Sequence, residues 1–184
     1  TIPSYNSQEY MEKAINSALI GGDDIEILVV DDGSSDNTLD IALKYEKKYP
    51  GIVRAIHKEN GGHGSTINVG IEKAQGTYFK VLDSDDWVNI GDFIEFVKLL
   101  KEETADAVIC DYRKEHVYNG KSEYFEYKDL EDGKKYNLNE IDLNILHGEY
   151  FMMATTTYRT EVLRASGLKM LEKTFYVDMQ YNIV

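Results

Sequence analysis

The stretch EILVVDDGS, residues 26–34, decides the fold expected for this chain of 184 residues. Its apolar part is short, rich in Val and Ile, and stopped by Asp, Gly and Ser, which form turns. A run of this length and composition predicts a strand buried on both faces, as in a parallel sheet covered by helices. Two adjacent carboxylates, Asp31 and Asp32, follow directly at the carboxyl end of this strand.

Helix and strand patterns alternate around the predicted strand. Asn6 and Glu9 match a capping box for a first helix, and Asp36 is placed to cap a second one. Alternation at this spacing predicts right-handed crossovers and a mainly parallel α/β sheet flanked by helices. We expect helices over residues 7–19, 36–49, 65–75 and 89–103, and further strands over residues 52–57, 78–82 and 107–112.

The pattern becomes more irregular after residue 112. Residues 113–128 hold Asn119-Gly120 between two polar, tyrosine-rich runs, which indicates a β-hairpin. The acidic segment 129–150 predicts one short helix, and residues 151–184 predict a strand near 155–158 and two helical pieces. Because no linker or repeat interrupts the chain, we expect one domain over residues 1–184.

Composition narrows the classes of function. The formal net charge is −13, from 33 acidic and 20 basic side chains, and this charge disfavours a nucleic-acid partner. A phosphorylated ligand would need a divalent cation or helix N-termini to hold it. The single cysteine, Cys110, excludes an intrachain disulfide and favours a reducing, cytoplasmic location. The chain opens without Met and stops within an apolar-periodic stretch, so we expect a fragment trimmed at both ends.

Polar clusters follow three of the predicted strands. They are Asp31-Asp32, the loop NGGHG at residues 60–64, and DSDD at residues 83–86. Open α/β sheets bind ligands at the carboxyl ends of their strands. Adjacent carboxylates repel one another unless a charge of opposite sign neutralises them, and a divalent cation with oxygen ligands does so most simply. The alternative is that these aspartates lie in solvated turns and cap the helices that follow.

Two familiar site classes do not match the sequence. The loop at residues 60–64 lacks the Gly-Lys-Ser/Thr of a phosphate-binding loop and the glycine spacing of a dinucleotide fold. His57, His63, His116 and His147 share no zinc-ligand spacing, so each is interpreted as a surface or core histidine.

Four motifs occur in a characteristic order: TIPSYN at residues 1–6, VDDGSSD at 30–36, ENGG at 59–62 with NVG at 68–70, and LDSDD at 82–86. Together they resemble the family 2 glycosyltransferases, densely over the first 110 residues and more weakly to the end. The resemblance implies the GT-A (Rossmann-like) fold, a nucleotide-sugar donor with a UDP-sugar favoured, a Mn²⁺ or Mg²⁺ ion, and inversion at the anomeric carbon. It divides the chain into a nucleotide-binding part, about 1–112, and a more irregular acceptor-side part, about 113–184.

The resemblance also assigns residues to the nucleotide. It implies that Pro3, Ser4 and Tyr5 line the base and ribose pocket, with Tyr5 against the uracil. It implies that Asp32, with Asp31 as the alternative, accepts a hydrogen bond from the uracil N–H.

The metal ion and the catalytic base follow from the same resemblance. Asp83 and Asp85 match the Asp-X-Asp element, which implies that Asp83 meets the ribose or the metal and that Asp85 meets the metal, with Asp86 as a second contact. The stretch YVDMQY at residues 176–181 matches the helix that carries the base, so Asp178 is the expected base. Val177 replaces the Glu usual in the family, and Ile67 stands where an Arg often precedes Asn.

The sequence therefore predicts a metal-dependent, inverting transfer from a nucleotide-diphosphate sugar to a carbohydrate or lipid-linked acceptor, in surface polysaccharide or glycolipid synthesis. The inner face of the cell membrane is an alternative location, reached through segments that the chain lacks. A sugar nucleotidyltransferase would need basic residues in its N-terminal loop, and PSYNS at residues 3–7 has none. A non-catalytic sugar-nucleotide-binding domain is the other alternative, which the joint presence of Asp83, Asp85 and Asp178 disfavours.

Overall fold

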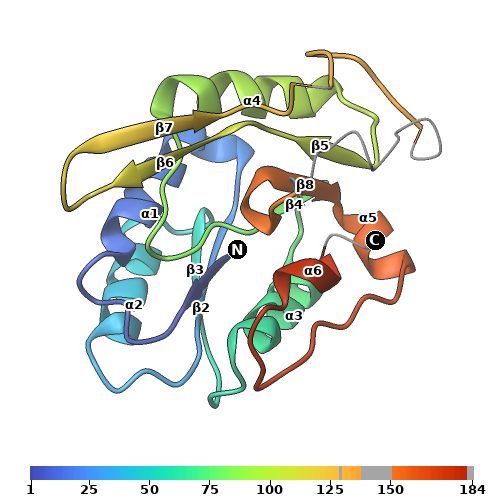
Figure 1. Ribbon diagram of the computed structural model, residues 1–184. Coiled ribbons are helices and arrows are strands. Elements are labelled where there is room, and N and C mark those ends of the chain that lie inside the picture. The colour runs from blue at the N-terminus through green and yellow to red at the C-terminus, as the bar shows by residue number, and fades with distance from the viewer. Residues whose placement is uncertain (129, 138–150, 182–184) are drawn as a thin grey trace.

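The computed structural model describes residues 1–128, 130–137 and 151–181, and the stretch after residue 26 forms a central parallel strand in it (Figure 1). This strand, β2 (Ile27–Asp31), pairs in parallel with β1 (Ile2–Ser4) on one side and with β3 (Val53–His57) on the other. All of its residues are buried, as predicted for a strand covered on both faces.

A second group of strands extends the sheet. β8 (Thr156–Arg159) lies between β4 (Tyr78–Lys80) and β5 (Ala107–Ile109) and pairs with both in antiparallel fashion. The strand expected near residues 155–158 is thereby confirmed. Its partners lie far away in the sequence, and its direction is opposite to that of its two neighbours.

Backbone hydrogen bonds of Thr1 join the two groups of strands. Its nitrogen donates to the carbonyl oxygen of Lys80 at 2.7 Å, and its carbonyl oxygen accepts the N–H of Leu82 at 2.9 Å. Thr1 thus bonds to the residues on either side of position 81. In a parallel pair of strands, one residue bonds in this way to the two neighbours of the residue opposite it. Among the described strands of the joined sheet, β8 alone runs in the opposite direction, which confirms the mainly parallel α/β prediction.

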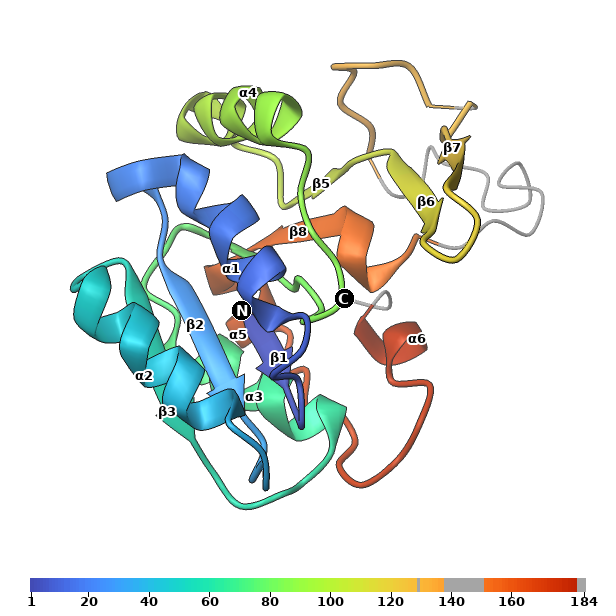
Figure 2. The same ribbon diagram turned by 90° about the vertical axis from the view of Figure 1, so that its left-hand side faces the viewer.

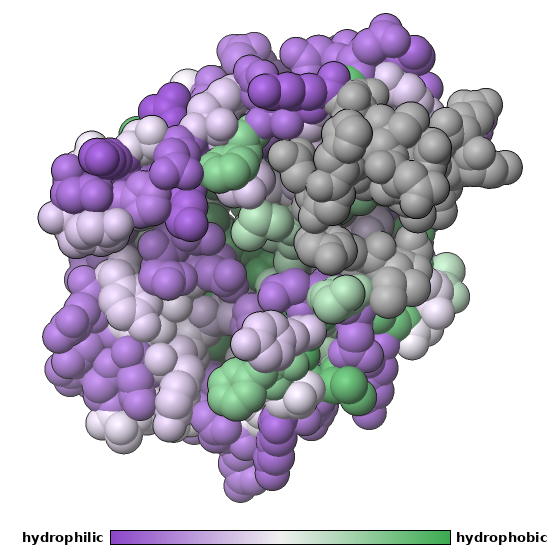
Figure 3. Space-filling model, in the orientation of Figure 1, coloured by the Kyte–Doolittle hydropathy of each residue, from purple (hydrophilic) through white to green (hydrophobic). Residues whose placement is uncertain are grey.

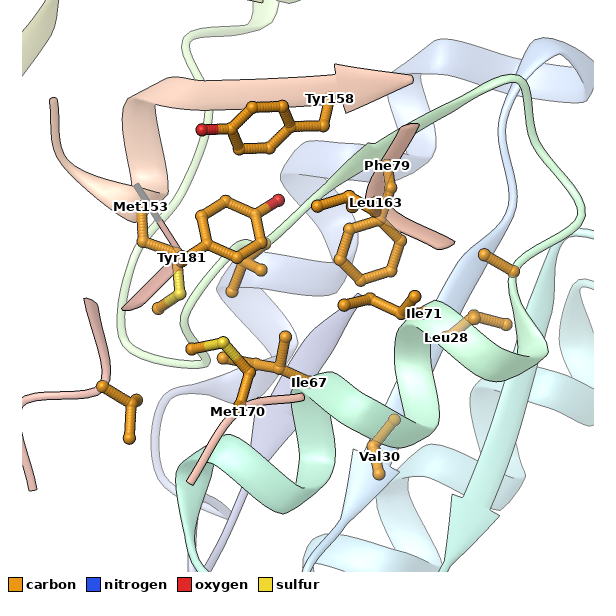
Figure 4. Close-up of a cluster of buried hydrophobic side chains, with 13 residues drawn as sticks. Leu28, Val30, Ile67, Ile71, Phe79, Met153, Tyr158, Leu163, Met170 and Tyr181 are labelled. Carbon is orange, nitrogen blue, oxygen red and sulfur yellow. The ribbon is translucent and has the colours of Figure 1, made fainter. Parts of the chain in front are cut away.

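Helices cover both faces of the sheet (Figure 1, Figure 2). On β2, Ile27 and Val29 belong to a core cluster shared with α1 and α2, whereas Leu28 and Val30 belong to a cluster shared with α3, α5 and α6. Figure 4 shows this second cluster, in which Ile67 and Tyr181 lie among the labelled side chains. The helices on the two faces are α1 (Met11–Ala18) with the 3₁₀ helix η1 (Leu19–Asp24), α2 (Thr38–Lys48), α3 (His63–Lys73), α4 (Ile90–Glu102), α5 (Thr160–Ala165) and α6 (Asp178–Tyr181).

The predicted capping box of the first helix is wrong. The cap position of α1 is Tyr10, which makes no side-chain cap hydrogen bond. Asn6 instead has a φ of 49° and accepts the N–H of Ser35 with its amide oxygen at 2.9 Å. Because another loop uses the polar side chain, the helix begins four residues later than its apolar periodicity suggested.

Side chains also satisfy the first turns of two later helices, as predicted for Asp36, although the cap position of α2 is Asn37. An oxygen of Asp36 accepts the N–H of Thr38, the first residue of α2, at 2.9 Å. The side chain of Asn89 accepts the N–H groups of Gly91 and Asp92 at the start of α4. Both contacts satisfy amide groups that a first helical turn leaves without partners.

The remaining chain forms a hairpin and short helical turns. β6 (Tyr112–His116) and β7 (Lys121–Phe125) are antiparallel, which confirms the hairpin predicted from Asn119-Gly120. A 3₁₀ turn, η3 (Met153–Thr155), precedes β8, and α5 and α6 confirm the two helical pieces expected after it. The short helix predicted in 129–150 falls largely outside the described residues. No helix in the described part of the chain is long and apolar enough to cross a bilayer.

Arg164 on α5 closes the carboxyl end of α3. Its guanidinium donates to the carbonyl oxygens of Ile71 at 2.8 Å, Ala74 at 2.7 Å and Glu72 at 3.2 Å. Carbonyl groups in a last helical turn lack intrahelical partners, and a cation there also interacts favourably with the helix dipole. One side chain therefore fixes α5 to the helix on which the polar edge of the sheet depends.

We expect Arg164→Met to lower the free energy of unfolding by about 2 kcal/mol, because it removes charged donors but keeps the length of the side chain. Urea denaturation measures the loss. The matched control is Arg113→Met, at an exposed position on β6. Equal losses for the two variants would contradict the capping role.

Candidate active site

Asp31 lies where three parallel strands end side by side. Its register partners are Ser4 on β1 and His57 on β3. The carboxylate is fully buried, with Oδ2 2.6 Å from Nδ1 of His57 and Oδ1 accepting the N–H of Ser34 at 3.2 Å. Both oxygens of Asp31 thus have partners inside the protein.

Asp32 organises the loop that leads into α3. Its Oδ1 accepts the N–H of Gly61 at 2.9 Å and lies 2.6 Å from Nζ of Lys58, while Oδ2 accepts the N–H of Gly62 at 2.8 Å. The hydroxyl of Ser65 donates to Oδ1 at 3.3 Å. A Cβ on Gly61 would lie 2.6 Å from this hydroxyl oxygen, so glycine is needed for the approach.

The two carboxylate oxygens of Asp32 make different numbers of polar contacts. Lys58, Gly61 and Ser65 all meet Oδ1, whereas the bond from Gly62 is the one contact to Oδ2 recorded for the described residues. A carboxylate oxygen has two lone pairs, so Oδ2 retains the capacity to accept one more N–H. The predicted uracil contact of Asp32 is compatible with this geometry and stays a prediction.

The loop after β1 interlocks with the loop after β2. The backbone N–H of Asn6 donates to Oγ of Ser34 at 2.9 Å, and its side-chain oxygen accepts the N–H of Ser35. Two residues later, the N–H of Gln8 donates to the carboxylate of Asp36 at 3.2 Å. These bonds hold Asn6 in its left-handed conformation and fix the residue before it.

That preceding residue, Tyr5, has 53% of its surface exposed. Pro3 and Ser4 are buried, and the hydroxyl of Ser4 donates to the carbonyl oxygen of Ile2 at 3.3 Å. Of the three residues expected to line a base and ribose pocket, Tyr5 thus offers its ring to the surface. Pro3 and Ser4 lie in β1, and the pocket role predicted for them stays a prediction.

The DSDD turn lies at the end of the chain segment that pairs with Thr1. Ser84 is buried, and its Oγ lies 2.9 Å from Oγ of Ser7, which fixes the turn to the loop after β1. The N–H of Asp86 donates to the carbonyl oxygen of Asp83 at 3.0 Å. Asp85 and Asp86 are exposed as whole residues and Asp83 is half-buried, while the carboxyl group of Asp86 is partly shielded from water by its neighbours.

Burial and the neighbouring carboxylates disfavour the ionisation of Asp86. Desolvation raises the pKa of Asp86 to about 6, and the charges of Asp83 and Asp85 act in the same direction. The charge of Lys80 opposes the shift without cancelling it. A cation bound at this turn would reverse the effect, because it favours the ionised form.

His63, the first residue of α3, links the polar clusters. Its Nε2 lies 3.1 Å from Oδ1 of Asp83. The carboxylate of Asp83 is the main cause that raises the pKa of His63, and the charges of Asp178 and Asp32 add to it despite the opposing effect of burial. The carboxylates expected to bind the base, the metal and the acceptor proton therefore act on the same imidazole. Ligand spacing alone gave His63 no such role.

Asn68 fixes a distant segment against α3. Its side-chain oxygen accepts the N–H of Met170 at 2.8 Å, and its Nδ2 donates to the carbonyl oxygen of Met170 at 3.0 Å. The fit is tight one turn earlier on the helix, where a Cβ on Gly64 would lie 2.1 Å from the carbonyl oxygen of Leu171. The glycine and the asparagine together determine where residues 170–173 lie.

The same segment positions α6. The N–H of Lys173 donates to the carbonyl oxygen of Gly61 at 2.7 Å, and the N–H of Leu171 donates to Oε1 of Gln180 at 2.8 Å. Asp178, the expected base, is the exposed first residue of this helix. Its backbone is thus tied to the glycine loop that Asp32 holds.

Within the described residues, no group of three or more His, Cys, Asp and Glu side chains is arranged to hold a metal ion. The turn at Asp83, Asp85 and Asp86 fits an incomplete oxygen site. Mg²⁺ in nucleotide enzymes is commonly bound by one or two carboxylates, with phosphates and water as the other ligands. The predicted metal contacts of these aspartates stay a prediction.

A cavity of about 250 Å³ lies elsewhere, between α4 and the amino ends of the strands. Its lining includes Ile27, Phe79, Phe93 and Val97. It is therefore at the opposite edge of the sheet from the carboxylate clusters, and ligands of open α/β sheets bind at the carboxyl edge.

Comparison with known proteins places the chain among glycosyltransferases. The family model described as "Glycosyl transferase family 2" matches residues 1–164. The putative glycosyltransferase EpsH of Bacillus subtilis is 38% identical over 119 residues, which are 64% of this chain and 34% of EpsH. An uncharacterized glycosyltransferase of Rickettsia typhi is 36% identical over 151 residues, which are 78% of this chain and 43% of that protein. The chain spans less than half the length of these relatives.

Solved structures share the fold. S. aureus TarS, residues 1–349, superposes with a TM-score of 0.76 at 26% identity, covering 99% of this chain and 54% of TarS. TarS in complex with UDP-GlcNAc gives a TM-score of 0.71 at 23% identity and covers 51% of that protein. The mannosyltransferase PcManGT of Pyrobaculum calidifontis, in complex with GDP-Man and Mn²⁺, gives 0.64 at 18% identity, covering 96% of this chain and 48% of PcManGT. The fold is therefore GT-A.

We expect Asp86→Asn to stabilise the protein relative to wild type, and increasingly so as the pH rises from about 4 to about 7. The folded state holds the Asp86 proton with a pKa of about 6, above the ordinary value of 3.8, so ionisation in this window costs more in the folded state. Thermal unfolding across this pH range without divalent cations measures the difference. Asp23→Asn, at an exposed position before β2, controls for the loss of one negative charge. A difference in Tm that does not change with pH would contradict the raised pKa of Asp86.

Proposed function

This chain belongs to glycosyl transferase family 2, and from that membership we propose that it transfers a sugar from a nucleotide-diphosphate sugar to an acceptor hydroxyl with inversion. The observation that carries the proposal is the sheet edge where the DSDD turn meets the loop after β1 through Ser7 and Ser84, with Nε2 of His63 lying 3.1 Å from Asp83. An inverting transfer needs donor contacts on one side of the reacting carbon and a base on the other. The strand ends supply the first group and α6 supplies the second.

For the donor we propose a UDP-sugar. The exposed ring of Tyr5 stacks on the uracil, and Oδ2 of Asp32 accepts the uracil N–H, with Asp31 as the alternative acceptor. Pro3 and Ser4 shape the pocket from below, and Asp83 meets the ribose or the metal. The complex of TarS with UDP-GlcNAc supports a uridine nucleotide, and the complex of PcManGT with GDP-Man makes a GDP-sugar the alternative.

We propose that Asp85, with Asp83 and Asp86, holds Mn²⁺ or Mg²⁺ together with the diphosphate. A bound divalent ion supplies Lewis-acid stabilisation of the charge that develops on the departing diphosphate. The three carboxylates fit this role because their mutual repulsion is relieved by a cation. The Mn²⁺ in the PcManGT complex supports the choice of ion.

We propose that Asp178 removes the proton of the acceptor hydroxyl as that hydroxyl attacks the anomeric carbon. Its carboxylate is exposed at the start of α6, where an acceptor can reach it. The hydrogen bonds of Asn68 with Met170 and of Leu171 with Gln180 hold the helix in place, so the base does not have to be ordered at each turnover.

The acceptor class that we propose is a carbohydrate or a lipid-linked carbohydrate of surface polysaccharide or glycolipid synthesis, modified in the cytoplasm or at the inner face of the cell membrane. The relatives named as glycosyltransferases support transfer over nucleotide-sugar synthesis. A non-catalytic, nucleotide-sugar-binding role would leave donor binding intact without turnover.

UDP should raise the Tm markedly more with Mn²⁺ or Mg²⁺ than with EDTA, because the acidic edge repels free diphosphate. At a UDP concentration of about 100 times Kd the stabilisation amounts to about 2.7 kcal/mol. We expect Asp85→Asn to abolish the dependence on metal and Asp23→Asn to preserve it. Equal stabilisation of the wild type by UDP with and without metal would contradict the assignment of Asp85 as a metal ligand.

Asp178→Asn should leave the affinity for UDP–Mn²⁺ near that of wild type and lower the turnover rate by about 10²–10⁴-fold, the usual contribution of a positioned base. Release of nucleotide diphosphate from UDP-GlcNAc or GDP-Man measures turnover. Glu172→Gln removes a neighbouring exposed carboxylate and should cost far less. If Asp178→Asn turns over within threefold of wild type, the base is another group.

A further inference from the structure

Large apolar side chains stand in solvent on both sides of the proposed base. Phe175 and Tyr176 precede Asp178 and are 89% and 87% exposed, and Met179 directly follows it at 63%. Figure 3 shows apolar surface exposed on this face of the molecule, beside a hollow near its middle. Two consecutive aromatic rings this open to water need an explanation, because exposed apolar surface that gathers in one place marks a binding surface.

The backbone beneath these rings is fixed and unusual. Tyr176 has a φ of 61° and Lys173 a φ of 53°, in the left-handed region that favours glycine. The N–H of Lys173 donates to Gly61, and Val177 is buried with 3% exposed, so the segment is anchored on both sides of the rings. An aromatic residue held in this conformation points to a functional constraint on where its ring lies.

The charge of the protein distinguishes between an anionic membrane surface and a neutral sugar as the molecule that binds the exposed rings. The charged residues next to the two rings along the chain are Glu172, Lys173 and Asp178, and the chain as a whole carries a net charge of −13. An anionic membrane surface is repelled by this net charge. A neutral sugar ring is not repelled, and it is the kind of molecule that the proposed transfer needs beside the base.

We propose that Phe175 and Tyr176, the aromatic pair, form a stacking surface for a neutral pyranose ring of the acceptor. The inference rests on the proposed function. One face of a pyranose carries C–H groups, which pack favourably on the electron-rich face of an aromatic ring. Stacking leaves the hydroxyl groups at the rim of the sugar free. Because Asp178 follows Tyr176 by two residues, at most about 7 Å of chain, a rim hydroxyl comes within reach of the carboxylate.

Saturation-transfer NMR with cellotetraose, chitotetraose and maltotetraose, in the presence of UDP and Mn²⁺, tests the aromatic pair. We expect at least one saccharide to receive saturation at its ring C–H protons. The double variant Phe175→Leu/Tyr176→Leu keeps the apolar area but loses the rings, and should raise the Kd about 3- to 10-fold. Phe175→Tyr keeps a ring and should bind within twofold of wild type. The matched control is Tyr118→Leu, at an 84% exposed tyrosine of the hairpin turn.

Other occupants predict different results. If the protein sediments with phosphatidylcholine or phosphatidylglycerol vesicles, and the double Leu variant still does so, the occupant of the aromatic pair is a lipid surface and not a saccharide. If sedimentation velocity shows a dimer that the double variant Phe175→Ala/Tyr176→Ala loses, the occupant of the aromatic pair is a second copy of the chain and not a saccharide. Absence of a saccharide signal in the wild type, or equal signals in the double Leu variant, overturns the inference. The Tm response to UDP and Mn²⁺ in the same samples separates this failure from a failure of the proposed function, which that response tests independently.

Discussion

The burial of one negative charge, that of Asp32, is the constraint on which the polar edge depends. The side chain is 4% exposed, so water contributes little to stabilising its charge, and the protein supplies the partners. It does so with the amides of Gly61 and Gly62 and the ammonium of Lys58. Removing either side of this arrangement would leave buried charges or amides without partners, which costs far more than an exposed ion pair does. The end of β2 and the start of α3 are therefore fixed together.

The contact between Asp32 and Gly61 also helps to position the segment that leads to the proposed base, Asp178. Because Asp32 fixes the amide of Gly61, it also fixes the carbonyl group of that loop, to which Lys173 donates. Further along α3, Asn68 makes two hydrogen bonds with Met170 of the same segment. The residues proposed to contact the donor and the acceptor thus share α3 as a common support. A rigid support of this kind suits a reaction whose rate depends on the relative placement of two groups.

Local patterns in the sequence predicted most of the scaffold, and long-range contacts account for what they missed. The apolar run before Asp31 specified a buried parallel strand because its composition and length leave few alternatives. Asn6 looked like a helix cap, but the loop after β2 competes for its side chain. His63 was interpreted as structural because spacing along the chain says nothing of Asp83, twenty residues away, with which it pairs. Lys58, the counter-charge of Asp32, could have been noticed as a cation directly after a predicted strand end.

The balance of charges at this edge explains why a diphosphate there would need a partner other than a side chain. Lys58 lies against Asp32 and is already neutralised. His63 faces Asp83, and the carboxylates of Asp85 and Asp86 remain exposed beside it. A diphosphate that entered this field would add negative charge to negative charge, and the amino end of α3 offers only the partial positive charge of a helix dipole. A divalent ion shared between the exposed aspartates and the phosphates neutralises both at once. The acidic composition, which disfavours a nucleic-acid partner, therefore agrees with the proposed metal-assisted recognition of a nucleotide-sugar.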